Sequence, residues 1–307
     1  MNAVTWLIQV LEVLIAVLAA PLFAGWIAQC RAVLQNRTPP SIWLPYRNIR
    51  KLLIKEAVLA EHASPLFRAA PYIVCGTMIC AAAIVPSTGT NLPFSNAADA
   101  IALVGLLATA RVFMALAAMD VGTAFGTLGA RREMMVGFLA EPALLIVIFV
   151  AALISQSTAL PTIAERLATD SFMLHPSLAF TAVAFGLVLL AENARLPVDN
   201  PATHLELTMI HEVMVLDHSG PAVGLIHYGA AVKFFAMTSI IARLVVPVST
   251  ESVLLDWGAF VAAMLGLAIV VGVVESVMAR LQLVLVPNLL IGAGMLTGLA
   301  LVLLFMG

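Results

Sequence analysis

The chain has 307 residues, of which 62% are hydrophobic and 10% are charged, and its formal net charge is −2. Soluble domains carry roughly 25% charged residues, and several apolar runs here reach about 20 residues, the length of a membrane-crossing helix. The composition therefore excludes an ordinary soluble protein. It predicts an all-α polytopic membrane protein that forms a single membrane domain, 1–307. We expect the chain to contact the lipid bilayer and to bind no nucleic acid.

The N-terminal run and the cysteines narrow the class further. Residues 1–29 contain no basic residue that could form the n-region of a signal peptide, so we expect the first helix to be retained. Cys30, Cys75 and Cys80 lack Cys-x-x-Cys spacing, so a disulfide, zinc or iron–sulfur framework cannot be built from this chain alone. We therefore expect any redox centre to lie in a partner.

Eight membrane-spanning helices are predicted from the apolar runs. Each run approaches or exceeds the length that crosses the hydrocarbon at about 1.5 Å per residue, and prolines stand near the run ends, where helices tolerate them. An even number of spans puts both termini on one side. The predicted spans are at about 3–29, 69–86, 97–119, 133–154, 178–194, 222–246, 256–278 and 285–306.

The basic residues predict the orientation in the membrane. Most of them fall in alternate loops, at about 30–68, 120–132, 195–221 and 279–284, whereas the opposite loops carry only Arg166. By the positive-inside rule, the basic loops face the cytoplasm and both termini face outward. We expect the chain in a bacterial or archaeal cytoplasmic (inner) membrane.

A short amphipathic segment lies in the first of these loops. Residues 46–56 alternate apolar and basic side chains at helical spacing, with Arg50 and Lys51 among the basic ones. The pattern is typical of a helix that lies at the lipid headgroups. It also suits a docking surface for a soluble partner, and the two interpretations are compatible.

Five ionisable residues lie several positions inside the predicted spans: Glu12, Arg111, Glu141, Lys233 and Glu275. A charge at that depth costs at least about 2.5 kcal/mol unless it is paired or hydrated. These residues therefore form either static ion pairs between helices or a hydrated proton path. Counted along the helices, Glu141 and Glu275 lie in the cytoplasmic half, and Glu192 lies at the cytoplasmic end of the fifth span. Arg243, near a helix end, is expected to extend to the interface.

A polar stretch, 191–220, interrupts the apolar chain. Placed on a helix at about 100° per residue, its second half puts Glu206 and Asp217 among apolar residues, so we expect both carboxylates to point inward. Histidines at a spacing of seven residues lie about 10.5 Å apart, too far to share an ion, so we expect no metal site. The polar face of this predicted helix holds His204, Thr208, His211, Glu212 and His218.

The sequence lacks the signatures of a self-contained enzyme. It has no Gly-rich phosphate loop after a strand, no Gly-x-Ser-x-Gly elbow and no His-Glu-x-x-His. The glycines of 122–129 are expected to form a flexible cytoplasmic turn. We therefore assign no catalytic residue and no complete active site to this chain.

Three blocks carry a family resemblance. Residues 46–56 together with 68–71 resemble the first cytoplasmic loop of the membrane-embedded subunit 1 of respiratory chain complex I and its hydrogenase relatives. Residues 129–133 together with 141–142 resemble its third-to-fourth-helix region. The second of these blocks is most similar to the membrane-bound, energy-converting NiFe hydrogenases, including the formate hydrogenlyase subunit 4 group. The loop signature of the family resembles Glu192-Asn-Ala-Arg195-Leu-Pro197-Val-Asp199, followed by Glu206-Leu207 and Asp217-His-Ser-Gly220.

The resemblance implies a non-redox subunit that anchors a soluble redox arm and conducts protons. It implies hydrogenase large and small subunits and an antiporter-like membrane subunit as partners, with the NiFe centre and iron–sulfur clusters in those partners and no cofactor in this chain. The candidates for a proton relay are Glu141, Glu192, Glu206, Asp217, Lys233 and Glu275. The candidates for contact with the soluble arm are Arg50, Lys51, Arg131, Arg132, Arg195, Asp199, His211 and Glu212.

Two alternatives stay open. The first is the quinone-site subunit of a complex I-type NADH:quinone oxidoreductase. Val198 in place of the usual Phe, and 200–204 where complex I carries further carboxylates, weigh against a bound quinone. The second is a stand-alone secondary transporter that uses Lys233 and the acids as its sites, against which the absence of visible inverted repeats weighs.

Overall fold

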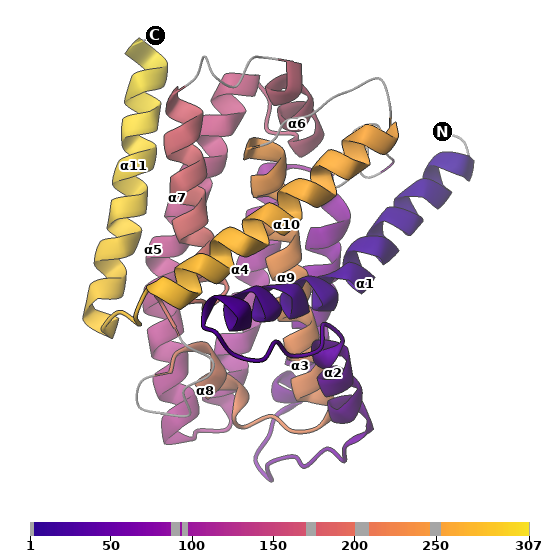
Figure 1. Ribbon diagram of the computed structural model, residues 1–307. Helices are drawn as coiled ribbons and strands as arrows, with labels where there is room; N and C mark the ends of the chain where they lie inside the picture. Colours follow the sequence, from indigo (N-terminus) through magenta and orange to yellow (C-terminus); the bar gives the residue numbers. More distant parts are fainter. Residues whose placement is uncertain are drawn as a thin grey trace.

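The described part of the chain folds into helices (Figure 1). The computed structural model describes residues 3–86, 93, 98–169, 176–199, 209–245 and 253–306. Its long helices are α1 (Ala3–Leu34), α3 (Pro65–Ile84), α4 (Ala100–Asp120), α5 (Ala124–Ser155), α7 (Pro176–Glu192), α9 (Pro221–Val245), α10 (Val253–Val277) and α11 (Val286–Met306). Shorter helices are α2 (Leu44–Ile54), α6 (Leu160–Thr169), α8 (His211–Val215) and the 3-10 turn η3 (Leu283–Leu285).

Seven helices of the described chain are long and apolar enough to cross a membrane: α1, α3, α4, α5, α9, α10 and the segment Leu283–Met306, which joins η3 to α11. The remaining long helix, α7, is apolar but has 17 residues, about 25 Å of helix, at the lower limit for a span. It packs against α5 and α11. The prediction of an all-α polytopic membrane protein is confirmed, and α7 occupies the position of the fifth predicted span.

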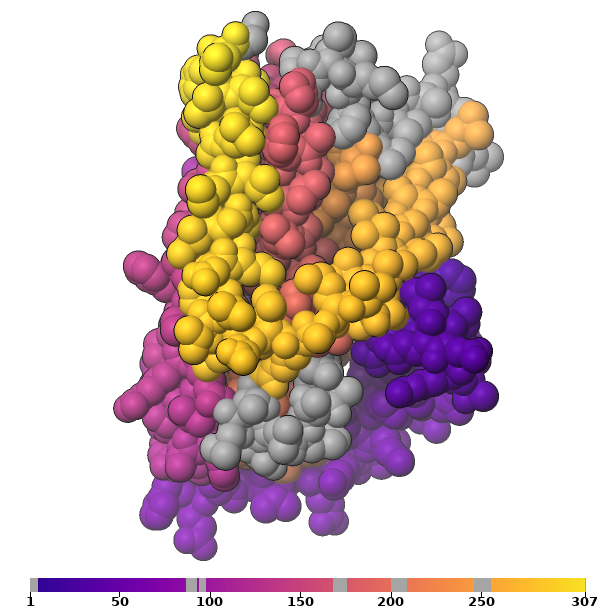
Figure 2. Space-filling view, turned by 60° about the vertical axis from the view of Figure 1, so that its left-hand side comes forward, coloured from indigo at the N-terminus to yellow at the C-terminus, as the bar shows by residue number. Residues whose placement is uncertain are grey.

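Two long helices are tilted relative to the others. Helices α5, α7 and α11 run roughly upright, whereas α1 and α10 cross the bundle diagonally (Figure 1). The tilted helices pack against each other, and Figure 2 shows them in contact on one face of the molecule. The start of α1 and the end of α11 lie toward one end of the bundle, and α2 and α8 lie toward the other (Figure 1). This arrangement agrees with an even number of spans.

The stretch 120–132, expected to be a loop, is largely helical. Helix α5 begins at Ala124 because Thr123 caps it: the Thr123 hydroxyl accepts a hydrogen bond from Gly126 N at 3.1 Å. Gly122 supplies the turn before the cap, with a φ of 73° that side-chain-bearing residues rarely adopt. The turn is therefore confined to the three residues between α4 and α5.

The later glycines of this stretch are packing residues. A Cβ on Gly126 would lie 2.6 Å from Asp217 Oδ2, and a Cβ on Gly129 would lie 2.9 Å from Val213 Cγ1. Glycine therefore allows the start of α5 to approach the segment around α8. The prediction of a flexible turn over 122–129 was wrong, because these glycines serve close contact between helices.

The amphipathic segment of the first loop is a helix, as predicted. Helix α2 has Pro45 in its first turn, where proline is tolerated, and the Tyr46 hydroxyl donates a hydrogen bond to the Leu18 carbonyl oxygen of α1. The chain just before α2 also touches α1, since a Cβ on Gly25 would lie 2.3 Å from the Ile42 carbonyl oxygen. Helix α2 is thus held against α1 and α9.

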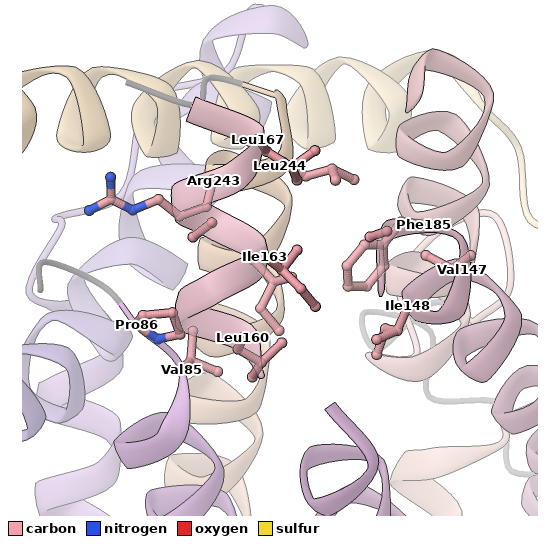
Figure 3. A pocket seen from close by; sticks show the side chains of 13 residues that line it. Val85, Pro86, Val147, Ile148, Leu160, Ile163, Leu167, Phe185, Arg243 and Leu244 are labelled. Carbon is pink, nitrogen blue, oxygen red and sulfur yellow. The ribbon is translucent and has the colours of Figure 1, made fainter. Parts of the chain in front are cut away.

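A narrow apolar cavity of about 40 Å³ lies between α5, α6, α7 and α9. Ile163 and Phe185 project into it, and the guanidinium of Arg243 points away from them (Figure 3). The Arg243 guanidinium carbon lies 4.9 Å from the centroid of the Phe260 ring. This cation–π contact joins α9 to α10 at the end of the bundle opposite to α2.

Candidate functional site

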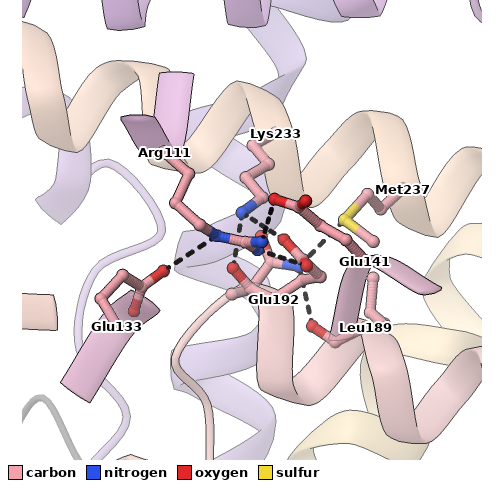
Figure 4. A network of polar contacts seen from close by, with 8 residues as sticks. Arg111, Glu133, Glu141, Leu189, Glu192, Lys233 and Met237 are labelled. Atoms are coloured by element: carbon pink, nitrogen blue, oxygen red, sulfur yellow. Dashed lines mark hydrogen bonds and ion pairs between the residues drawn. The ribbon is translucent and has the colours of Figure 1, made fainter. Parts of the chain in front are cut away.

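Five charged residues from four helices meet inside the bundle, and we call them the Arg111 network: Arg111 from α4, Glu133 and Glu141 from α5, Glu192 from the end of α7 and Lys233 from α9 (Figure 4). Arg111 Nη1 lies 2.5 Å from Glu141 Oε1, and Arg111 Nη2 donates to Glu192 Oε1. Arg111 Nε lies 3.3 Å from Glu133 Oε1. Lys233 Nζ donates to Glu192 Oε2 at 2.9 Å and to the Glu192 carbonyl oxygen at 2.6 Å.

The spacing on α5 explains how one guanidinium reaches two of these carboxylates. Glu133, Gly137 and Glu141 are four residues apart and share one face of the helix. A Cβ on Gly137 would lie 2.7 Å from Arg111 Nη1. The missing side chain therefore makes room for the guanidinium between the two glutamates.

Burial makes this pairing obligatory. The side chain of Glu192 is 1% exposed and that of Arg111 is 8% exposed, so an unpaired charge at either position would cost several kcal/mol. Glu141 is the most accessible member, with 33% of its side chain exposed. Three carboxylates share two cations, so at least one carboxylate lacks a cation of its own.

A cavity of about 70 Å³ adjoins the network. Its polar lining comes from Arg111, Glu133, Glu192, Asn193, His211 and Lys233. A water molecule needs roughly 15 Å³ of such volume and two or more polar partners, so the cavity has room for a few waters. His211, on α8, brings the polar stretch of the sequence to the edge of the network.

A second group of charges, which we call the Glu275 cluster, joins α1, α10 and the loop after α7. Glu275 Oε1 accepts a hydrogen bond from Arg195 Nη1 at 2.9 Å, and Glu275 Oε2 accepts one from Arg31 Nη1 at 3.4 Å. The Arg195 guanidinium carbon also lies 4.4 Å from the centroid of the Phe234 ring. No ion pair among the described residues joins this cluster to the Arg111 network.

Asp199 organises the same loop. Its carboxylate accepts hydrogen bonds from Ile210 N at 2.9 Å and His211 N at 3.2 Å, at the start of α8. It also lies 3.1 Å from Arg280 Nη2, beyond the end of α10. Asp199 thus fixes the start of α8 and ties the loop to α10.

Asp217 and its neighbour are placed differently from each other. The half-buried Asp217 accepts a hydrogen bond from the Thr123 hydroxyl at 2.6 Å, at the start of α5. His218 is buried, and its ring stacks on Phe67 with centroids 4.1 Å apart. Burial lowers the pKa of His218 to about 4, against an opposing effect of the Asp217 carboxylate. His218 is therefore neutral at neutral pH.

The prediction that His218 lies on a polar helix face was wrong. Helix α8 ends at Val215, so the angular spacing of a helix does not extend to His218. The apolar Leu216 is 54% exposed, whereas His218 is buried. His204 and Thr208, from the same predicted face, and Glu206, predicted to point inward, lie outside the described residues.

The remaining predicted interface residues lie toward α2 or around α8. Arg132 donates to the Met209 carbonyl oxygen at 2.9 Å, which anchors the chain before α8 to α5. Glu212 is partly exposed on α8. Arg50, Lys51 and Arg131 are exposed. Within the described residues, no group of three His, Cys, Asp or Glu side chains is placed to hold a metal ion.

Four members of these charged groups were not among the predicted site residues: Arg111, Glu133, Arg31 and Arg280. Arg111 was recognised only as a charge inside a span. Glu133 was recognised only as the start of a span, although its i, i+8 relation to Glu141 was visible in the sequence. Arg31 and Arg280 were assigned to loops, and nothing in the local sequence indicates their partners Glu275 and Asp199.

Known proteins resemble this chain over most of its length. The sequence matches the family described as NADH dehydrogenase over residues 7–306. It is 33% identical to hydrogenase-4 component C of Escherichia coli (strain K12) over 237 residues, 77% of this chain and 74% of that protein. It is 31% identical to formate hydrogenlyase subunit 4 of the same strain over 285 residues, 92% of this chain and 89% of that protein.

The fold is also found in a solved structure. A chain of the membrane-bound sulfane sulfur reductase, an archaeal respiratory membrane complex, superposes with a TM-score of 0.83 at 17% sequence identity, covering 96% of this chain and 98% of that chain. At this identity the likeness concerns the fold alone. Together with the sequence matches, it places the eight long helices in a known architecture, and the chain belongs to the NADH dehydrogenase family, as its resemblance to subunit 1 of complex I and its hydrogenase relatives predicts.

Proposed function

We propose that this chain is the membrane anchor and a proton-conducting subunit of a NiFe-hydrogenase or formate hydrogenlyase-type complex. The relatives named hydrogenase-4 component C and formate hydrogenlyase subunit 4 support the type of complex. The chain supplies no redox centre in this proposal. The NiFe centre and iron–sulfur clusters belong to the hydrogenase large and small subunits, and an antiporter-like membrane subunit continues the ion path.

The single observation that carries proton conduction is the Arg111 network beside its cavity. Three carboxylates share two cations there, so the surplus carboxylate can hold a proton without leaving a cation unpaired. Waters in the adjoining cavity would connect it to His211 on α8. Glu141 is the candidate for the residue through which a proton leaves the network, because its side chain is the most exposed of the five.

Anchoring is assigned to the end of the molecule that carries α2 and α8. The predicted contact residues Arg50, Lys51, Arg131 and Glu212 lie there or next to it, and none is fully buried. In the proposed mechanism, a redox change in the soluble arm moves the loop that begins at Arg195. The movement alters the contacts of Glu192, three residues earlier, and hence its proton affinity. Glu206 and Asp217 remain relay candidates in the same loop.

The test compares Glu141→Gln with Glu61→Gln in inverted membrane vesicles that contain the complete complex. Glu61 is an exposed carboxylate in the loop between α2 and α3, so its variant controls for the loss of a negative charge. Glu141→Gln is expected to retain hydrogen evolution from reduced methyl viologen and to lose most of the proton translocation, which a pH-sensitive dye reports. Full translocation in Glu141→Gln would instead make the Arg111 network a set of static ion pairs.

One observation favours the quinone-site alternative. A groove of about 480 Å³ lies between α1, α2 and α9, with Gly25, Leu52 and Ala231 in its wall, and its size falls in the range of about 300–1,000 Å³ usual for small-molecule sites. A quinone-site inhibitor that blocks electron transfer in the complex, with an Ala231→Leu variant resistant to it, would support a quinone reductase. Insensitivity of the complex to such inhibitors would support the hydrogenase-type proposal.

A further inference from the structure

A second groove lies on the other side of α2, between α2, α3 and α9, with a volume of about 620 Å³. Its wall is mainly apolar, and it includes the rings of Trp43, Tyr46 and Tyr228. The two tyrosines direct their hydroxyl groups to α1: Tyr46 donates to the Leu18 carbonyl oxygen and Tyr228 donates to the Val17 carbonyl oxygen at 3.0 Å. With both hydroxyls satisfied, the groove presents aromatic and aliphatic carbon.

The rim of this groove is cationic. Arg47 and Arg50, one turn apart on α2, line the groove. Both side chains are exposed, and neither forms an ion pair with any residue that the structure describes. An unpaired cationic rim above an apolar groove calls for a ligand that is anionic at one end and apolar at the other.

The position of the groove identifies the kind of ligand. Helices α3 and α9 are membrane-spanning candidates, so the wall they form lies in or next to the hydrocarbon. Helix α2 is amphipathic and has no buried residue, which is typical of a helix at the level of the lipid headgroups. Trp43, 57% exposed at the start of α2, is of the residue type enriched at that level.

We propose that this groove binds one anionic phospholipid. Arg47 and Arg50 bind the phosphate and the negatively charged headgroup, and an acyl chain occupies the groove between α3 and α9. Gly224 sets one boundary of the site, because a Cβ there would lie 3.3 Å from Leu52 Cβ, where α2 and α9 come together. The bound lipid would hold α2 in place beside the groove that α2 shares with α1.

The experiment uses the complete complex, purified in detergent and stripped of lipid, with phosphatidylglycerol or phosphatidylethanolamine added back and binding followed by native mass spectrometry. The wild-type complex is expected to bind one phosphatidylglycerol per chain in preference to phosphatidylethanolamine. Arg47→Gln/Arg50→Gln is expected to weaken that binding by about tenfold or more, since each basic residue near an anionic lipid contributes roughly fivefold.

Two matched controls separate this site from general attraction of lipids to basic loops. Arg37→Gln/Lys55→Gln removes two exposed charges from the same loop, away from the groove, and should leave binding unchanged. Ile79→Trp fills the groove from α3 and should displace the lipid with the arginines intact, whereas Ile101→Trp, at an exposed position on α4, should not.

Several outcomes would overturn the proposal. Equal binding of the two phospholipids would remove the role of the arginines, and equal losses in the two double variants would make the attraction nonspecific. If the arginine variant kept its lipid but lost the soluble subunits, the rim would be a protein-docking surface. Unaltered binding in Ile79→Trp would exclude the groove as the acyl-chain site.

Discussion

The Arg111 network and the Glu275 cluster both hold carboxylates inside an apolar chain, but they balance charge in opposite ways. In the Arg111 network, three carboxylates share two cations, and Glu192 and Arg111 are almost fully buried. In the Glu275 cluster, one buried carboxylate is shared by Arg31 and Arg195, whose side chains are 32% and 21% exposed.

This difference in charge balance indicates different functions for the two groups of charges. The surplus carboxylate of the Arg111 network, beside a cavity with room for water, suits the transfer of protons. The Glu275 cluster has surplus positive charge and no carboxylate to spare, and it joins two tilted helices to the loop after α7. We infer that Glu275 acts as a tether for the loop, which is an alternative to its predicted role as a relay residue. Variants of the two groups can test this division.

The largest effect is expected from removing a cation of the Arg111 network. Arg111→Met leaves Glu133, Glu141 and Glu192 without their shared partner, at a cost of about 3–5 kcal/mol as for other broken buried pairs. The apparent Tm of the detergent-purified complex should fall strongly. Arg31→Met, its counterpart in the Glu275 cluster, should lower Tm much less, because Arg195 still pairs with Glu275 and Arg31 is partly hydrated. Equal losses would remove the distinction between the two groups.

A smaller effect is expected from Glu275→Gln, which releases Arg31 and Arg195 together. Both arginines are partly exposed, so we expect a loss of about 2 kcal/mol, typical of hydrogen bonds to charged groups. If Glu275 is a tether, amide hydrogen exchange should accelerate in 193–199 and at the end of α10. Proton translocation should fall less than in Glu141→Gln. Unchanged exchange in the loop, combined with lost translocation, would make Glu275 a relay residue.

The stacking of the neutral His218 ring on Phe67 offers a test of whether an uncharged contact also stabilises the loop. The pKa of His218 is about 4 in the folded protein and about 6.5 in an unfolded chain, so the unfolded state binds more protons between these values. Stability should therefore fall as the pH is lowered through this window, by about 2 kcal/mol between pH 7 and pH 5.

His218→Phe keeps an aromatic ring against Phe67 and removes the titration. Its apparent Tm should depend less on pH than that of the wild-type protein over pH 5–7. The control His62→Phe changes an exposed histidine in the loop between α2 and α3 and should keep the wild-type dependence. A pH dependence that persists in His218→Phe would assign it to other groups.

The smallest effect concerns the glycines at the start of α5. Gly129→Ala places a methyl group 2.9 Å from Val213 Cγ1, and the adjustment of α8 should cost about 1 kcal/mol. Gly105→Ala, on α4, meets nothing within 4 Å and should be neutral or slightly stabilising. Thermal unfolding of the two variants compares them directly. A neutral Gly129→Ala would mean that the junction of α5 and α8 is loose.

The membrane class, the positions of the spans and the residues worth attention could be predicted from the sequence because they depend on local properties. The length of an apolar run determines whether a helix can cross the hydrocarbon. A charged residue inside such a run is conspicuous, so Arg111, Glu141, Lys233 and Glu275 were recognised without knowledge of their partners. The helix α2 was visible for the same reason, since its amphipathic pattern spans only a few turns.

Predictions from local residue patterns were wrong at two places, His218 and the glycines after Gly122. His218 was placed by helical periodicity although α8 ends at Val215, and the glycines after Gly122 were taken for a turn although their backbone is helical. In both cases the deciding factor was a contact with another segment: Phe67 stacks on the histidine, and Val213 fills the space beside Gly129.

The sequence by itself determined which charges lie inside apolar runs, and the tertiary structure alone decided how buried they are and how they are grouped. Glu192 pairs with Arg111, 81 residues away, and Glu275 pairs with Arg31, 244 residues away. No local pattern encodes such distances, because they depend on which helices pack together and on the tilt of α1 and α10. The physical reason is that a buried charge must find a partner, but helix packing determines which partner is within reach.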